Sequence, residues 1–255
     1  FISFSGGVES TTMCLLYGKG ATAIFSDTGS EHDEMYERID YVEKMLKAYH
    51  NDDFKLVRIR AKVETGGEVV DSLTEYIKVR NCFPSARSRF CTRLFKIAPI
   101  DKYLSSQGEC ELMIGLNADE AKDRTGNFGL EANVKYTYPL VDDNYDRQRC
   151  KDLLEQYGLL PQFPPYMDRG GCKFCPFKSK KEFAAMVHLA PDEIEEIARL
   201  EEGIQDNRNK YFRIRSNMPK LRHFISIEKN NLLGDLSQYY ASDEDRKSCG
   251  VFCHR

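Results

Sequence analysis

Two glycines flanked by serines stand close to the start of the chain, directly after a short apolar stretch at residues 1–4 that is typical of a β-strand. The run reads Ser5-Gly6-Gly7-Val8-Glu9-Ser10. Glycines let the backbone approach a phosphate closely, and amides at the start of a helix point toward an anion. Serine hydroxyls add hydrogen-bond donors. No Gly-Lys-Ser/Thr ending follows, so the run is not a Walker loop, and a plain tight turn is the alternative interpretation.

A second candidate site contains two cysteines three residues apart. Cys172 and Cys175 form a C-x-x-C pair that Pro176 follows. This spacing places two sulfurs on one metal ion or cluster, and proline after cysteine is common at iron–sulfur sites. Zinc held by four cysteines and a redox-active dithiol are the alternatives. The pair therefore predicts metal, cluster or redox chemistry without deciding between them.

A third cysteine lies within a basic stretch. Residues 80–96 contain Cys91 and no acidic residue. The cations of this stretch are Arg80, Arg87, Arg89, Arg93 and Lys96. Because they surround a cysteine, we interpret the stretch as an anion site, and a solvated surface is the alternative.

The last residues include two more thiols, Cys249 and Cys253. Arg246, Lys247 and His254 are close to them in sequence, and neighbouring cations lower the pKa of a thiol and make it nucleophilic. The alternative is a disordered tail with two incidental thiols.

Strands alternate with helices around these motifs. Strands are expected at residues 21–26, 54–59 and 110–115, and helices at 34–49, at 146–157 and from Pro191 onward. This alternation predicts a doubly wound, mostly parallel α/β sheet, in which ligands bind beyond the carboxyl ends of strands. The glycine loop and the Asp27 loop lie at two such ends and should converge. We expect an α/β nucleotide-binding domain at residues 1–140 and a helical, cysteine-containing region at 141–255.

Composition excludes several classes of protein. The chain has 255 residues, of which 41% are hydrophobic and 30% charged, with a net charge of −3, so bulk charge does not indicate a nucleic-acid binder. No apolar run approaches the length of a membrane span, and no secretory leader is visible, although Phe1 is not an initiator methionine. Nine cysteines, an odd number, argue against a secreted disulfide framework. We therefore expect a cytoplasmic enzyme that is not bound to a membrane.

Three motifs resemble one enzyme superfamily. Ser-Gly-Gly-x-Asp-Ser after an N-terminal strand is the signature of the PP-loop ATP pyrophosphatases, and here Glu9 stands in place of the aspartate. The Asp27-Thr28-Gly29 segment resembles the branch that contains the phosphoadenosine phosphosulfate reductases. Residues 115–124 resemble its Gly-x-Arg-x-x-Glu-Ser-x-x-Arg segment, but Asn117 replaces the first arginine and Ala121 the serine. Either replacement weakens an anion contact or alters the substrate.

The resemblance implies ATP as nucleotide substrate and Mg²⁺ as cofactor. It implies nucleotide-binding roles for the following residues: Ser5, Gly6, Gly7, Glu9, Ser10, Thr28, Gly29 and Gly115. It implies catalytic roles for Asp27, as a ligand of Mg²⁺ or the nucleotide, and for Glu120 and Arg124.

The resemblance also bears on the cysteines. The segment from Cys91 through Lys96 to Pro99 resembles the branch's Cys-x-x-x-x-Lys-x-x-Pro segment, and relatives hold a [4Fe–4S] cluster with such a cysteine and a distal C-x-x-C pair. This implies cluster ligation by Cys91, Cys172 and Cys175, with Zn²⁺ as the alternative. The candidates for the fourth ligand are Cys82, Cys150, Cys249 and Cys253, of which Cys253 is preferred. Small buried thiols are the alternative interpretation of Cys82, Cys110 and Cys150.

Two activities and one non-catalytic role compete. The first is an ATP pyrophosphatase that adenylates a substrate for sulfur transfer and resembles DNA phosphorothioation proteins, with DNA or a DNA-processing complex and a cysteine desulfurase as partners. The second is a sulfonucleotide reductase, in which Cys249 attacks the sulfate sulfur and a thioredoxin-like donor reduces the product. The intact glycine loop favours the first and the tail cysteine favours the second. The third is a nucleotide- or cluster-binding module without activity.

Overall fold

The computed structural model describes residues 1–85, 87–121, 133–168, 170–208, 213–215 and 218–230. Within these residues a five-stranded parallel sheet forms the centre of the molecule, in the order β3-β2-β1-β6-β7. Its strands are β1 (Ile2–Phe4), β2 (Thr22–Asp27), β3 (Lys55–Arg60), β6 (Cys110–Met113) and β7 (Val134–Thr137). The first four match the strands expected from the sequence, and β7 was not expected.

The strand order reverses direction next to β1. The chain moves outward from β1 to β2 and β3, and later continues on the other side of β1 with β6 and β7. In open parallel sheets, ligands bind where the order reverses, beyond the carboxyl ends of the strands. The glycine loop follows β1 and the Gly115 segment follows β6, so both begin at this point. The doubly wound α/β fold is thereby confirmed.

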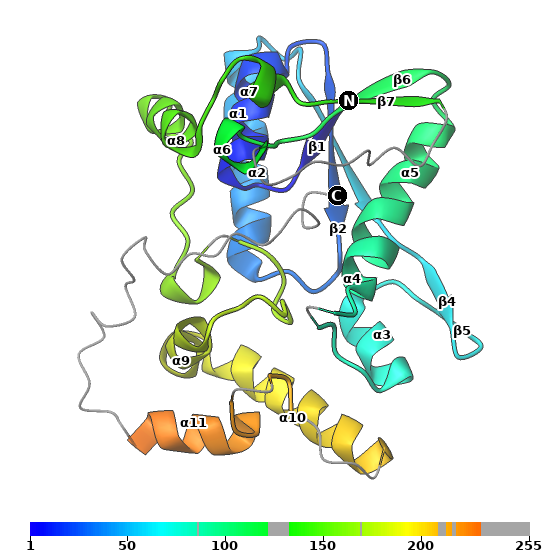
Figure 1. Ribbon diagram of the computed structural model, residues 1–255, viewed down its shortest axis with the longest axis vertical. Coiled ribbons are helices and arrows are strands. Elements are labelled where there is room, and N and C mark those ends of the chain that lie inside the picture. Colours follow the sequence, from blue (N-terminus) through cyan, green and yellow to red (C-terminus); the bar gives the residue numbers. More distant parts are fainter. Residues whose placement is uncertain (86, 122–132, 169, 209–212, 216–217, 231–255) are drawn as a thin grey trace.

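Helices cover both faces of the sheet (Figure 1). Helices α1 (Val8–Tyr17) and α2 (Asp33–Tyr49) lie on one face, and α5 (Ala98–Ser105) lies on the other. The side chains of β2 point alternately to the two faces of the sheet. Ala23 and Phe25 belong to the hydrophobic cluster under α1 and α2, whereas Ile24 belongs to the cluster under α5. A strand buried on both faces needs apolar residues on both, as the consecutive Ala23, Ile24 and Phe25 provide.

Short elements connect these layers. They are the hairpin β4 (Val63–Thr65) and β5 (Glu68–Val70), α3 (Leu73–Arg80), α4 (Phe90–Thr92), the π-helix η1 (Arg93–Ile97), α6 (Ala118–Ala121) and α7 (Pro139–Asp142). The π-helix runs directly into α5, and such insertions are frequent at functional sites.

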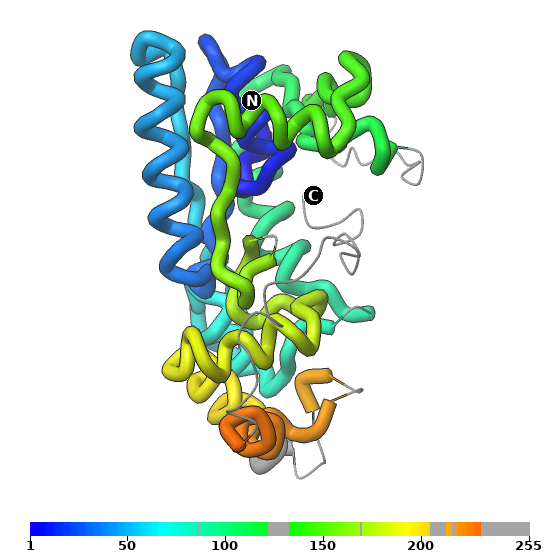
Figure 2. Tube along the Cα trace, turned by 90° about the vertical axis from the view of Figure 1, so that its left-hand side faces the viewer, coloured from blue at the N-terminus to red at the C-terminus, as the bar shows by residue number. Residues whose placement is uncertain are grey.

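The C-terminal region is helical: its last three helices gather at one end of the molecule, whereas its first helix lies beside α1 (Figures 1 and 2). It comprises α8 (Arg147–Gln156), the 3₁₀ turn η2 (Pro165–Met167), α9 (Lys180–Leu189), α10 (Pro191–Arg208) and α11 (Leu221–Asn230). Asp146 caps α8, and Ser179 forms a capping box with Glu182 at the start of α9. The two carboxylate oxygens of the buried Glu201 accept hydrogen bonds from the amides of Ile214 and Leu221, which fastens α11 to α10.

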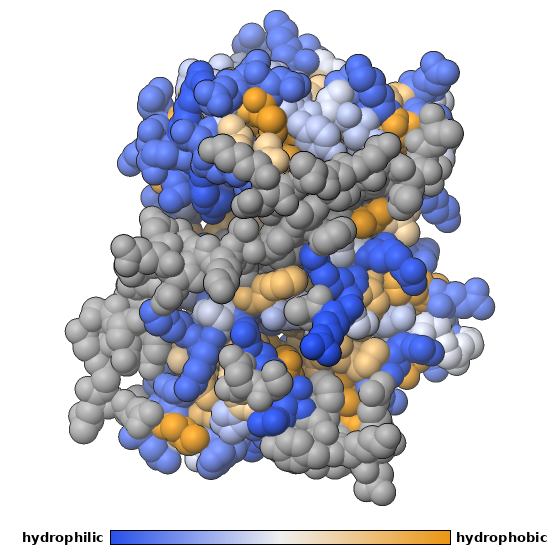
Figure 3. Space-filling model, in the orientation of Figure 1, coloured by the Kyte–Doolittle hydropathy of each residue, from blue (hydrophilic) through white to orange (hydrophobic). Residues whose placement is uncertain are grey.

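One hydrophobic cluster crosses the predicted boundary at residue 140. It contains Ile2 and Phe25 from the sheet together with Leu154 and Phe224 from the helical region. The division into two parts stays a prediction, but the parts share a core. The visible surface is mostly hydrophilic with small scattered apolar areas (Figure 3). Among the described residues, no helix combines the length and apolar character that crossing a bilayer requires.

Candidate functional site

The glycine loop folds back on the first turn of α1. The Ser5 amide donates to Ser10 Oγ at 3.2 Å, and the two serine hydroxyls lie 3.1 Å apart. Gly7 occupies the N-cap position of α1 in an extended conformation, and no hydrogen bond from a side chain caps the helix within the described residues. The first amides of α1 and the two hydroxyls therefore gather at the carboxyl end of β1, in an arrangement suited to an anion.

Gly6 is confined by its backbone conformation and by its neighbours. Its φ of +77° lies in the left-handed region. A Cβ at this position would lie 3.0 Å from Ile39 Cδ1 and 3.1 Å from Met35 Sδ, both on α2. Arg38 of the same helix donates to the Gly6 carbonyl at 3.4 Å. Helix α2 thus holds the loop in place and leaves no room for a side chain.

The Gly115 segment approaches the same loop closely. A Cβ on Gly115 would lie 3.1 Å from the Ser10 amide nitrogen, so only glycine fits beside the first turn of α1. Two residues further on, Asn117 Nδ2 donates to Glu9 Oε1 at 3.0 Å, and both residues are buried. Two of the three positions at which the chain departs from the resembling motifs are therefore in direct contact. Arg147 Nη1, at the start of α8, donates to the same oxygen at 2.5 Å.

The segment after β2 turns around Asp27. One carboxylate oxygen accepts hydrogen bonds from the Gly29 amide at 2.7 Å and the Tyr36 hydroxyl at 2.8 Å. The other accepts from Arg60 Nη2 at 2.8 Å. Burial and the Asp27 carboxylate raise the pKa of Tyr36, and the hydrogen bond to Asp27 raises the pKa of Arg60. Asp27 orders this loop, and its role toward Mg²⁺ or the nucleotide stays a prediction.

The predicted convergence of the two loops is confirmed. Strands β1 and β2 are parallel neighbours with Phe4 opposite Phe25, so the loops that follow them leave the same edge of the sheet. Helix α2 contacts both loops, since Tyr36 binds Asp27 and Arg38 binds Gly6.

The segment after β2 also pairs with the C-x-x-C segment. Glu31 and Cys172 form an antiparallel backbone bridge, and the Lys173 amide donates to the Ser30 carbonyl at 3.0 Å. The buried Thr28 hydroxyl donates to Glu31 Oε1 at 2.8 Å. The same six-residue stretch from Asp27 to His32 therefore borders the glycine loop and pairs with the segment that contains Cys172.

Three thiols gather behind this stretch. Cys172 is 7% exposed and Cys91 is 8% exposed, and each interacts electrostatically with Cys175 and with Lys96. Burial, with Glu31 and Cys175 close by, raises the pKa of Cys172. Burial also raises the pKa of Cys91, against the opposing effect of Lys96. Buried thiols of this kind are protonated unless a cation stabilises the thiolates.

Two further contacts connect this thiol group to the basic stretch. The Phe83 and Phe174 rings lie 5.8 Å apart, and the Arg89 guanidinium lies 5.0 Å from the Phe177 ring centroid. Cys82, a candidate ligand, directly precedes Phe83 in the chain. Among the residues that the structure describes, no three His, Cys, Asp or Glu side chains form a set of metal ligands.

The remaining cysteines have other surroundings. Cys150 is buried beside Thr12 and Glu9, and burial raises its pKa to about 12. Cys110 and Cys82 are partly exposed, so the alternative interpretation of a buried thiol is wrong for both of them and holds for Cys150. Arg124, Cys249 and Cys253 lie outside the described residues. Glu120, in α6, stands one turn after Asn117, whose side-chain oxygen accepts from the Glu120 amide at 2.9 Å.

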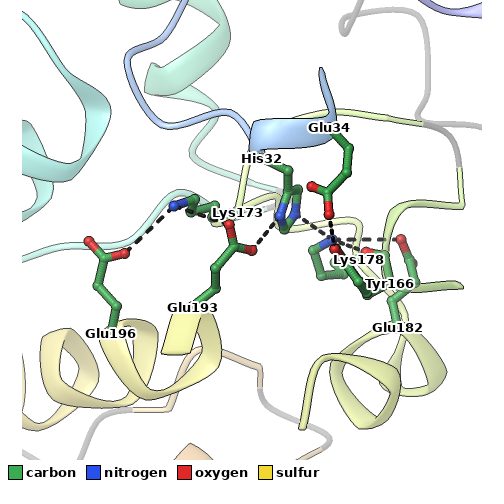
Figure 4. A network of polar contacts seen from close by, with 8 residues as sticks. All are labelled: His32, Glu34, Tyr166, Lys173, Lys178, Glu182, Glu193 and Glu196. Atoms are coloured by element: carbon green, nitrogen blue, oxygen red, sulfur yellow. Dashed lines mark hydrogen bonds and ion pairs between the residues drawn. The ribbon is translucent and has the colours of Figure 1, made fainter. Parts of the chain in front are cut away.

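A buried polar network fastens the C-terminal helices to the stretch after β2 (Figure 4). His32 is fully buried, with Nδ1 2.5 Å from Glu193 Oε2 and Nε2 3.2 Å from Lys178 Nζ. Because a lysine ammonium only donates, Nε2 accepts and the proton lies on Nδ1, facing Glu193. Burial opposes ionisation of Glu193, but its hydrogen bond to His32 and the charge of Lys173 produce a net lowering of its pKa.

Lys178 is the centre of the same network. It is 4% exposed, donates to the Tyr166 carbonyl, and lies 3.9 Å from the Glu182 carboxylate. The Tyr166 hydroxyl donates to Glu34 on α2. Residues from α2, η2, α9 and α10 thus meet around one buried histidine, only two residues after Ser30. The sequence offered no signal for this network beyond the position of His32 next to the Asp27 loop.

Fold and site together define a nucleotide-binding PP-loop α/β protein. Residues 1–137, more than half of the chain, match the family model described as the phosphoadenosine phosphosulfate reductase domain. The chain belongs to this family, within the PP-loop ATP pyrophosphatase superfamily. The family supports an enzyme with nucleotide-binding or sulfonucleotide-reductase-like function.

Three relatives are similar to the chain at low identity. Two are uncharacterized proteins of Methanocaldococcus jannaschii. One is 27% identical over 74% of this chain and 44% of its own length, and the other is 25% identical over 71% and 38%. The third, an uncharacterized 37.8 kDa protein of Escherichia phage 186, is 24% identical over 78% of this chain and 73% of its own length. The chain thus spans less than half of each archaeal relative.

Proposed function

We propose that this protein is an ATP pyrophosphatase that adenylates a substrate and prepares it for sulfur transfer. The observation that supports this most directly is the glycine loop. Both glycines and both serines of the motif are present, Ser5 and Ser10 turn their hydroxyls toward each other, and the first turn of α1 begins at Gly7. Main-chain amides in this arrangement suit a pyrophosphate group.

In the proposed reaction, a substrate oxygen forms a bond to the α-phosphorus of ATP while the bond from that phosphorus to the bridging oxygen breaks. Pyrophosphate leaves, and the substrate carries AMP. The residues of the loop hold the pyrophosphate in line with the attacking oxygen, which is mainly positioning and charge neutralisation. Asp27 is the proposed Mg²⁺ or nucleotide ligand, and Glu120 and Arg124 are proposed for the acceptor side of the site.

The thiol group is proposed as the site of a [4Fe–4S] cluster held by Cys91, Cys172 and Cys175 with a fourth cysteine. Lys96 interacts electrostatically with all three thiols and would offset the negative charge of thiolate ligands. A bound cluster would support the fold or deliver sulfur to the adenylated substrate. The contact between Phe83 and Phe174 favours Cys82 as the fourth ligand. Cys253, the ligand preferred from the sequence, stays a candidate together with Cys249, and Zn²⁺ stays the alternative metal.

The acceptor is proposed to be a nucleic acid. Arg87 and Arg93 are exposed at the two ends of the segment that contains Cys91, where they can contact a phosphodiester backbone. DNA phosphorothioation would place the acceptor phosphate beside the cysteines, and a cysteine desulfurase would supply the sulfur.

A second candidate function is sulfonucleotide reduction. The description of the matched family model favours it. In this reaction the Cys249 thiolate attacks the sulfate sulfur, the nucleotide leaves, and a thioredoxin-like dithiol releases sulfite from the resulting thiosulfonate while it is oxidised to a disulfide.

The experiment that separates the two activities measures both products. The full chain, purified without oxygen, is incubated with ATP and Mg²⁺ for pyrophosphate release, and separately with a sulfonucleotide and a dithiol for sulfite. We expect pyrophosphate. Sulfite without pyrophosphate would establish the reductase, and the absence of both products would leave a binding module.

Iron and acid-labile sulfide are measured in the wild type and in Cys172→Ser and Cys175→Ser, and we expect both to be lost in the two variants. Cys110→Ser, a cysteine on β6, is the matched control.

A further inference from the structure

A buried acid lies in the first turn of the helix that faces the proposed phosphate site. The Glu9 side chain is 6% exposed and belongs to α1, one residue before Ser10 of the loop. An ionised carboxylate in this position opposes the helix dipole's attraction for an anion and repels a polyphosphate. The loop can bind a nucleotide well only if this charge is neutralised.

Arg147 supplies the neutralising charge. Its Nη1 lies 2.5 Å from Glu9 Oε1, and Asn117 Nδ2 donates to the same oxygen at 3.0 Å. The Arg147 backbone is held as well, because its amide donates to Asp119 Oδ2 at 3.3 Å. Asp119 belongs to α6, in the segment that passes the loop at Gly115. The guanidinium is therefore positioned by two elements that border the glycine loop.

The arginine beside Glu9 comes from a different part of the chain than the arginine of the motif that this chain resembles. At position 117, where that motif has an arginine, this chain has the neutral Asn117. Arg147 lies beyond the matched residues 1–137, in α8, which packs against α1. A guanidinium from the C-terminal region thus compensates for a charge that is missing inside the family domain.

We propose that Arg147 is a positioning residue of the phosphate site, which holds Glu9 against Asn117 and cancels its charge. The identity of the ligand, the polyphosphate of ATP, rests on the proposed function. Arg147 acts through Glu9. Removing Arg147 therefore weakens nucleotide binding only while residue 9 carries a negative charge, and this dependence separates the role from a direct contact with phosphate.

The test is a double-mutant cycle on the full chain, with affinity for α,β-methylene-ATP and Mg²⁺ measured by calorimetry. We expect Arg147→Ala to weaken binding at least tenfold and Arg147→Lys to restore most of the loss. Glu9→Gln should bind at least as tightly as the wild type, and adding Arg147→Ala to Glu9→Gln should change affinity less than threefold. Arg149→Ala, which removes a cation from the same helix that stacks on Tyr145, is the matched control and should bind normally.

Several results would overturn the proposal. An unchanged affinity in Arg147→Ala would show that Glu9 needs no partner, and equal losses with and without Glu9→Gln would show that Arg147 acts on the ligand directly. Loss of Mg²⁺-dependent binding in Glu9→Gln alone would make Glu9 a metal ligand instead. If Arg147→Ala does not fold, Arg147→Gln, which keeps a long polar side chain but no charge, carries the test with and without Glu9→Gln. A folded wild type that binds no nucleotide would refute the proposed function itself, whereas a wild type that binds, without the expected cycle, refutes only the role of Arg147.

Discussion

Replacing Gly6 with alanine tests the glycine loop directly. At a φ of +77°, any residue with a Cβ pays about 1–2 kcal/mol for the left-handed backbone. The new methyl group would also lie 3.0 Å from Ile39 and 3.1 Å from Met35, and overpacking of this kind costs about 1–3 kcal/mol. We therefore expect Gly6→Ala to lower the free energy of unfolding by about 2–5 kcal/mol, or to move the loop to relieve the contact.

Two matched variants separate backbone strain from loop geometry. Gly67, in the β4–β5 turn, has a φ of +82° and nothing within 4 Å of an added Cβ, so Gly67→Ala carries only the left-handed cost of about 1–2 kcal/mol. Gly7 has a φ of −76°, and its added Cβ would meet Ser5 Oγ at 3.5 Å, an ordinary contact. Gly7→Ala should therefore fold almost normally.

The assay combines urea unfolding with ATP affinity. A shift of the loop amides displaces several hydrogen-bond donors at once, so we expect Gly6→Ala to weaken ATP binding at least tenfold, about 1.4 kcal/mol. Gly67→Ala should lose stability but bind ATP normally. If Gly6→Ala binds ATP as the wild type does while it remains folded, the nucleotide does not bind at this loop, and the reasoning from its geometry is refuted.

The network around His32 gives two more predictions. His32→Ala removes a partner from the buried Lys178 and from Glu193, and should cost about 1–3 kcal/mol in urea unfolding, whereas the exposed His223→Ala should cost nothing measurable. An unchanged stability of His32→Ala would show that the network is dispensable. Because the folded-state pKa of Glu193 is lowered, its contribution is complete above the ordinary glutamate range of about 4.3 and is lost as pH falls through the folded value. Unfolding measured from about pH 7 to pH 3 should therefore fall less steeply in Glu193→Gln than in the wild type, and parallel curves would contradict this assignment.

The sheet and the loops at its edge were readable from the sequence for a physical reason. Strands buried on both faces are rich in consecutive apolar residues, as at residues 23–25, and the turn residues that follow them mark the carboxyl ends. Strand β7 was missed because its four residues, Val134 to Thr137, are too few for alternation to stand out. The β4–β5 hairpin is too short for periodicity to reveal it.

The candidate site was predicted only in part, because its decisive contacts join residues far apart in the chain. The sequence showed Glu9 and Asn117 as two separate departures from a motif, each of which suggested a weakened site. Their contact, 108 positions apart, and the ion pair from Arg147, 138 positions from Glu9, are products of the packing of α8 on α1. No periodicity or spacing connects such positions. Glu9 and Asn117 therefore look like losses from a motif in the sequence, whereas in the structure they are hydrogen-bonded to each other and Glu9 is paired with Arg147.

The pairing of Glu31 with Cys172 joins the two candidate sites through the main chain. The main chain of Ser30 and Glu31 is bonded to Cys172 and Lys173, and the same stretch begins at Asp27 beside the glycine loop. Backbone groups buried away from water need hydrogen-bond partners, and this isolated bridge provides them for both segments. The buried His32 network connects the far side of the stretch to Glu193 on α10 and to Lys178, just before α9. The Asp27 loop beside the glycine loop and the segment of Cys172 are therefore joined through main-chain hydrogen bonds and through the buried side chains around His32.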